Sequence, residues 1–92
     1  MIGFVSNIMV SVIKMAVIYR RIKDLREDKD WTQQNVADML HISRSAYSAY
    51  ENGANAAPIE VLIALAKLHN TSIDYLLEQT DDPRPYERKK KR

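Results

Sequence analysis

The chain lacks cysteine and contains only two glycines and two histidines among its 92 residues. Without cysteine it has no disulfide, thiol nucleophile or thiolate metal ligand, and this composition suits the reducing cytoplasm. Gly3 and Gly53 are too far apart to form a glycine-rich phosphate-binding loop. His41 and His69 lack the spacing of a metal site and are interpreted as structural. With no recognisable Ser-His-Asp arrangement either, the sequence argues against an enzyme, a metal site and a bound cofactor.

Residues 32–53 have the pattern of two short helices joined by a tight turn. Thr32 and Ser43 are residue types that cap helix N-termini, and each stands directly before one of the expected helices. His41-Ile42 marks the turn, and Gly53 can adopt the positive φ that ends a helix. The first helix has an apolar face at helical spacing, formed by Val36, Ala37 and Leu40.

Two helices of this kind that cross at short range form a helix-turn-helix. Small Ala37 allows the close crossing, with Tyr47 and Tyr50 turned inward. In this arrangement the second helix lies in the major groove of DNA, with its N-terminal residues at the base edges. Its outward positions hold side chains that do not obstruct a groove: Arg44, Ser45, Ser48 and Ala49.

The run from about residue 21 to residue 77 resembles the Cro and phage-repressor-type helix-turn-helix family, also called XRE-like. Three segments match in order and at the family's spacing: RIKDLREDKDWTQQNVADML, SRSAYSAYENG and PIEVLIALAKLHNTSIDYLL. The resemblance implies an all-α, five-helix, lambda-repressor-like domain over residues 19–79. An apolar N-terminal extension (1–18) precedes this domain, and an extended, proline-containing basic tail (80–92) follows it.

The sequence departs from the family at two positions. The family usually has glycine after its first helix and at the turn, where this chain has Asp30 and His41. Both positions require left-handed backbone, which Asp and His tolerate better than most residues other than glycine. We therefore expect a modest loss of stability and the same fold.

For function, the resemblance implies a transcriptional regulator that binds double-stranded DNA as a homodimeric repressor on a pseudo-palindromic operator. Arg44 is expected to contact a base, because a guanidinium bonds guanine O6 and N7 bidentately. Ser45 and Ser48 would read base edges weakly, and Ala49 would meet a thymine methyl group. Gln33 matches a phosphate-binding Gln of the family. The expected contacts to the DNA backbone are Gln33, Ser43, Asn52 and Asn55.

Arg26 falls on the inner face of the expected first helix, residues 19–29, where a charge needs a partner. In the resembled family an Arg at this place pairs with a Glu at the end of the second helix of the motif, which here is Glu51. We expect a bidentate structural ion pair, with phosphate binding by Arg26 as the alternative. Arg20 and Arg21, at the start of the helix, either reach the DNA backbone or lie in solvent.

Two further helices follow the motif. Pro58 is expected to open the fourth helix and Asn70 to end it. Ser72 is expected to cap the fifth helix, whose apolar face either completes the core or is shared between two protomers. The apolar residues at core spacing in these helices are Leu62, Leu65, Ala66, Ile73, Leu76 and Leu77.

The N-terminal extension, residues 1–18, is almost wholly apolar, with Lys14 as its one charge. It lacks the basic start of a secretory signal and is too short to span a membrane. Read as a helix, it carries a seam of alternating three- and four-residue spacing, formed by Ile2, Val5, Met9, Val12 and Ala16. Its content of β-branched residues also permits a strand. Three interpretations remain. The segment is a packing or dimerisation element, or the native start is Met15 and the first fourteen residues contribute little to the protein, or, last, the segment is a membrane-surface anchor.

Charge is distributed unevenly along the chain, although the net charge is only +2. Residues 1–31 hold six basic and four acidic side chains, residues 32–80 two basic and five acidic, and residues 81–92 six basic and three acidic. The motif is therefore acidic on balance, and affinity for the DNA backbone has to come from the flanks, from amide contacts or from dimerisation. The basic run 88–92 is either a solvated end or a DNA-binding arm.

A second hypothesis is an antitoxin or adaptor of the same fold whose main partner is another protein. The apolar N-terminus and the acidic middle of the chain favour it. A steep fall of DNA affinity with added salt would favour the DNA-binding regulator instead.

Overall fold

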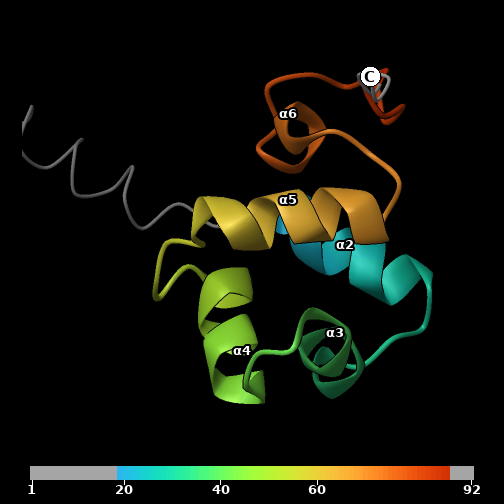
Figure 1. Cartoon of the computed structure of the whole chain (residues 1–92). Helices are drawn as coiled ribbons and strands as arrows, with labels where there is room; N and C mark the ends of the chain where they lie inside the picture. The colour runs from blue at the N-terminus through green and yellow to red at the C-terminus, as the bar shows by residue number, and fades with distance from the viewer. Residues whose placement is uncertain (1–18, 88–92) are drawn as a thin grey trace, which may run out of the picture.

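The computed structural model describes residues 19–87. These residues form α2 (Arg20–Asp28), α3 (Gln33–Leu40), α4 (Arg44–Asn52), α5 (Ile59–Leu68) and α6 (Ile73–Leu76) and contain no strand. Figure 1 shows α3 and α4 at one end of the domain, α6 at the other, and α2 and α5 between them. The all-α, five-helix prediction is confirmed, whereas the apolar extension 1–18 and the basic run 88–92 lie outside the described residues.

Short polar side chains fix where three of the helices begin. The Thr32 hydroxyl accepts a hydrogen bond from the Asn35 backbone N–H at 3.0 Å, and the Asn35 side chain accepts one from the Thr32 N–H at 2.9 Å. Each bond satisfies a backbone group that a helix end or its cap would otherwise leave free. All three predicted polar caps are present: Thr32, Ser43 and Ser72.

Left-handed residues end the helices where the sequence predicted them. Asp30 (φ 56°) follows α2 and His41 (φ 58°) follows α3, at the two places where the resembled family has glycine. For residues other than glycine this conformation costs about 1–2 kcal/mol each. Gly53 (φ 82°) follows α4, and Asn70 (φ 51°) lies just beyond the end of α5.

Two helix boundaries differ slightly from the expectation. Tyr19 and Lys29 flank α2 as its caps and are not part of the helix. Pro58 precedes α5 instead of opening it, because its ψ of 157° is extended, and Ile59 is the first helical residue. Proline still suits the cap position, since its ring fixes φ near −65° and it has no N–H to satisfy.

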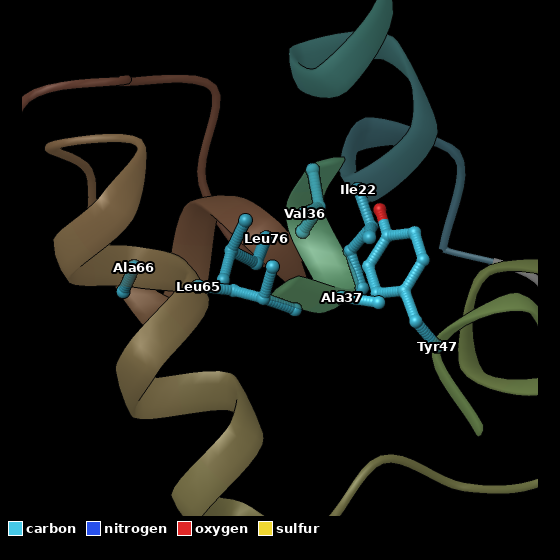
Figure 2. Close-up of a cluster of buried hydrophobic side chains, with 7 residues drawn as sticks. All are labelled: Ile22, Val36, Ala37, Tyr47, Leu65, Ala66 and Leu76. Atoms are coloured by element: carbon cyan, nitrogen blue, oxygen red, sulfur yellow. The ribbon is translucent and has the colours of Figure 1, made fainter. Parts of the chain in front are cut away.

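Each of the five helices among residues 19–87 contributes to one hydrophobic core. Ala37 on α3 is fully buried, and its small side chain lets α4 approach closely. Figure 2 shows the ring of Tyr47 beside Ile22 and Ala37. Tyr50, which was expected to turn inward with Tyr47, is only partly covered. The buried core residues are Ile22, Val36, Ala37, Tyr47, Leu65, Ala66 and Leu76.

The ion pair expected between Arg26 and Glu51 is the main polar contact inside the domain. The Arg26 Nε and Nη2 atoms donate to the two carboxylate oxygens of Glu51 at 2.9 and 2.8 Å. Arg26 Nη1 also donates to the Trp31 carbonyl at 2.8 Å. The pair therefore joins α2 to α4 and to the loop before α3, with only 3% of the Glu51 side chain exposed.

The pKa of Glu51 reflects this environment. Burial alone would raise it, but hydrogen bonds from Arg26 and Gln33 outweigh burial and hold the pKa below its ordinary value. The Glu51 side chain is therefore an anion at neutral pH, and it needs the guanidinium to offset the loss of its hydration.

A second polar contact joins the loop before α3 to the end of α5. His69 is buried, and its Nδ1 lies 3.2 Å from the Lys29 ammonium, while its ring lies 5.8 Å from the Trp31 ring. Burial, with a smaller contribution from Lys29, lowers the pKa of His69 to about 4. His69 is therefore neutral in the folded domain at physiological pH.

Removing one partner of the buried Arg26–Glu51 pair should lower the free energy of unfolding far more than removing one partner of an exposed pair. Arg26→Ala leaves the Glu51 charge buried, and we expect it to lower the free energy of unfolding by about 3–5 kcal/mol. The Arg26→Met/Glu51→Leu double variant, which removes both charges, should lose less than Arg26→Ala. Urea unfolding measures each, with Arg84→Ala as the control because its pair with Asp82 is exposed. Equal losses for Arg26→Ala and Arg84→Ala would contradict the structural role.

Lowering the pH should reduce the free energy of unfolding through His69, at pH values above those at which the Asp and Glu side chains of the domain take up protons. The unfolded chain binds a proton at this histidine near pH 6.5, whereas the folded domain does so only near pH 4. Stability should therefore fall as the pH drops below about 6.5, by at most about 1.4 kcal/mol per pH unit. Urea unfolding between pH 7 and pH 5 tests this. His69→Gln should abolish that fall in stability, whereas His41→Gln, a control at an exposed histidine, should not. If stability fell with pH in His69→Gln as it does in the native chain, His69 would not be the cause.

Candidate nucleic-acid interface

Helix α4 has one buried side and one open side. Tyr47 and Glu51 are buried and fasten the helix to the rest of the domain. Arg44 and Ser45, in its first turn, are exposed, and Ser48 and Ala49 are partly exposed. The four residues expected at base edges therefore lie on the accessible part of a helix that is fixed from behind.

The start of α4 is held by Ser43. Its hydroxyl oxygen accepts from the Ala46 backbone N–H at 3.0 Å, and the side chain is exposed. Since a hydroxyl is both donor and acceptor, the proton of Ser43 remains free to bond an oxygen outside the domain. Ser43 can therefore cap the helix and bind an anion at the same time.

Gln33 is positioned by the ion pair behind it. Its Nε2 donates to Glu51 Oε1 at 3.2 Å, so the side chain of the first residue of α3 is tied to the C-terminal part of α4. The amide carries a second N–H that this bond does not use. Gln33 therefore retains one side-chain N–H group for the expected contact with a phosphate.

The two asparagines after α4 occupy different settings. Asn52 is the last residue of the helix, and its side-chain oxygen accepts from the Ala54 N–H at 2.9 Å, which leaves its amide N–H groups available. Asn55 is exposed, and its backbone N–H bonds the Ala49 carbonyl at 3.2 Å. Both side chains can still donate outward.

A polar groove brings some of these residues together. Gln33, Ser48 and Asn52 line it, above the Arg26–Glu51 ion pair. Ser43, Arg44, Ser45, Ala49 and Asn55 are not among its lining residues. On α4, Arg44, Ser48 and Asn52 follow one another at intervals of four residues and so share a face. That face runs from the expected base-reading end of the helix to the groove.

Sequence reasoning missed two residues of this groove, Glu27 and Lys23. Lys23 is exposed on α2 and lines the groove with Gln33, Ser48 and Asn52. The signal was present, because Lys23 stands three residues before Arg26 and residues at this spacing lie on neighbouring parts of a helix surface. Lys23 supplies the groove with a cation that is not committed to an ion pair among residues 19–87.

Arg21 is not among the residues that line the groove, and it is not simply solvated, so the interpretation that it lies free in solvent was wrong. Its guanidinium lies 4.1 Å from the centre of the Tyr75 ring and donates to the Tyr75 carbonyl at 2.9 Å and to the Thr80 carbonyl. It also pairs with Asp81 at 2.7 Å. Arg21 therefore fastens the segment after α6 to the start of α2.

Residues 80–87 have no helix, as expected, and are held against the domain at further points. The Thr71 hydroxyl donates to the Pro83 carbonyl at 2.6 Å, and the Tyr86 hydroxyl bonds the Asp74 carboxylate. Figure 1 shows this segment beside α6, at the end of the domain away from α3 and α4.

Two findings limit other kinds of site within residues 19–87. The described part of the chain has no cluster of three or more His, Asp or Glu side chains that could hold a metal ion. Among the same residues, no helix combines the length and the apolar character needed to cross a membrane.

Comparison with known proteins gives several significant matches. YobD of Bacillus subtilis, named an uncharacterized HTH-type transcriptional regulator, is 36% identical over 66 residues, which are 72% of this chain and 59% of YobD. The HTH-type transcriptional regulator AnsR of Bacillus subtilis is 42% identical over 57 residues, 62% of this chain and 49% of AnsR.

A third relative comes from another organism. The cryptic phage CTXphi transcriptional repressor RstR of Vibrio cholerae is 31% identical over 61 residues, 66% of this chain and 55% of RstR. The chain thus spans about half the length of the curated relatives it matches. No solved structure matches it significantly.

The family described as helix-turn-helix matches residues 22–76, more than half of the chain. This range contains α3 to α6 and all but the first two residues of α2, and with them the capped pair α3–α4 and the ion pair behind it. The chain therefore belongs to the Cro and phage-repressor-type, XRE-like helix-turn-helix family.

Proposed function

We propose that the chain is a sequence-specific DNA-binding transcriptional regulator that acts in the cytoplasm. The observation that carries this proposal is the exposed first turn of α4, with Arg44 and Ser45 outward, on a helix whose other side is fixed by Tyr47 and Glu51. Such a helix can enter the major groove without unfolding any part of its support.

The accessible side chains of α4 and of its surroundings divide into those that read bases and those that contact the DNA backbone. Arg44 pairs with a guanine through O6 and N7 and supplies most of the base discrimination. Ser45 and Ser48 accept or donate at base edges, and Ala49 contacts a thymine methyl group. The backbone contacts, which position α4 without reading sequence, are made by Lys23, Gln33, Ser43, Asn52 and Asn55.

The groove beside α4 supports the assignment of backbone contacts. A DNA phosphate placed there would meet the Lys23 ammonium, the free N–H of Gln33 and the amide of Asn52. Glu51 is not a repulsive charge for that phosphate, because the Arg26 guanidinium neutralises it. Glu27, which also lines the groove, weakens the attraction and leaves Lys23 as its main source.

We further propose that the protein binds as a homodimer and represses. Residues 32–80 carry a net charge of −3, so one copy of the motif has little electrostatic affinity for DNA. A second copy doubles the contacts, with the two α4 helices about 34–36 Å apart or a multiple of that on a pseudo-palindromic site. Repression is supported by the names of RstR and of the competence pilus inhibition repressor, whereas BcrR is named an activator.

The alternative function is an antitoxin or adaptor that mainly binds another protein. The acidic balance of residues 32–80 favours it. The two functions differ in salt dependence, because phosphate contacts release counterions when they form. DNA affinity that falls steeply with added salt supports the regulator, and weak affinity at low salt supports the alternative.

Arg44→Ala should relax base preference at one position in each half-site. Its loss removes a bidentate contact worth about 1–3 kcal/mol of discrimination, or roughly 5- to 150-fold in relative affinity. Binding to a set of single-base variants of the operator measures this, with Ser45→Ala as a control that should change preference much less. Unchanged preferences in Arg44→Ala would remove Arg44 from the reading surface.

Lys23→Gln should weaken binding to every sequence alike and leave base preference unchanged. Each lost phosphate contact should reduce the slope of log affinity against log salt by about 0.9. The matched control is Lys67→Gln, since Lys67 is equally a surface lysine but lies on α5, outside the groove. If the two variants had the same salt slope, the groove would not be a phosphate contact.

A further inference from the structure

An apolar surface on α5 is left open in the described part of the domain. Ile59 is 68% exposed and Ile63, one turn later, is 40% exposed. From Ile63 the surface continues into an open groove of about 180 Å³ between α5, α6 and the segment after α6. Apolar side chains along this groove are Ala66, Ile73, Pro85 and Tyr86.

The chain itself contains a segment of matching chemistry. Residues 1–18 include 13 apolar side chains and a single charge, Lys14. On a helix the apolar seam Ile2, Val5, Met9, Val12 and Ala16 lies opposite a polar stripe of Gly3, Asn7, Ser11 and Lys14. We infer that this segment docks through its seam on the Ile59–Ile63 face of α5 in the same chain.

The dimensions of the two elements agree with this docking. If it is helical, a segment of eighteen residues would span about 27 Å, and the ten residues of α5 span about 15 Å. The segment is therefore long enough to run along α5 and past its end into the groove. With the seam on α5, the Lys14 ammonium stays in water and no charge is buried.

The point of attachment also agrees. The segment joins the domain at Tyr19, which packs against the core, and Arg21, two residues later, bonds the Tyr75 carbonyl in α6. The start of α2, to which the segment is joined, thus contacts α6, which forms one wall of the groove. A turn of a few residues before Tyr19 is enough to bring the seam onto α5.

The α5 face could be covered by the chain's own residues 1–18 or by a second copy of the chain. The covalent attachment of residues 1–18 to the domain favours the first. A short tether keeps the segment at an effective concentration near the millimolar range at the α5 face. A second copy competes only at its much lower concentration in solution. The face is therefore covered by residues of the same chain, and its cover does not depend on protein concentration.

Thiol accessibility tests the inference in the full chain, which has no cysteine of its own. Ile63→Cys and Met39→Cys are a matched pair, because both native side chains are 40% exposed in the described residues and Met39 lies on α3. Alkylation of each is measured without DNA and normalised to the rate in denaturant. We expect Ile63→Cys to react about ten-fold more slowly than Met39→Cys.

The same pair is then measured with Val5→Asp, Met9→Asp and Val12→Asp introduced together into the seam. The rate of Ile63→Cys should rise to that of Met39→Cys, and the Met39→Cys rate should not change. Equal rates for the two cysteines in the native background would overturn the inference. Protection of Ile63→Cys that disappears on dilution would also overturn the inference, because it would assign the face to a second copy of the chain. Protection that persists in the presence of the seam substitutions would overturn it as well.

Discussion

A charge buried inside a small helical domain has to be neutralised, and here Arg26 and Glu51 neutralise each other where three elements meet. The guanidinium satisfies both carboxylate oxygens of Glu51 and the Trp31 carbonyl, so one side chain ties α2, the entry to α3 and the end of α4. Gln33 adds a fourth tie through the same carboxylate. The orientation of α4, and with it the direction in which Arg44 points, depends on this junction.

Much of the domain could be predicted from local sequence because its determinants are local. Thr32, Ser43 and Ser72 cap helices through backbone groups only three residues away. The left-handed positions at Asp30 and His41 follow from where two helices have to stop. The exposed side of α4 follows from helical periodicity once Tyr47 is placed in the core.

Other features could not be predicted because they depend on contacts between distant residues. Arg21 bonds groups 54 to 60 positions further along the chain, and no local pattern distinguishes it from a solvated arginine. The spacing of Lys23 from Arg26 indicated a shared part of the α2 surface, but only the packing of α2 near α3 and α4 brings Lys23 into the groove. The partly covered position of Tyr50 likewise reflects packing that helical spacing alone does not determine.

The central claim is that α4, fixed from behind by Arg26–Glu51, reads the major groove of duplex DNA. Selection of bound sequences from random duplexes at low salt tests it most directly. The account predicts enrichment of a pseudo-palindrome with a G·C pair in each half-site and half-sites about one helical turn, or a multiple of one turn, apart. Recovery of sequences with no common motif would contradict it.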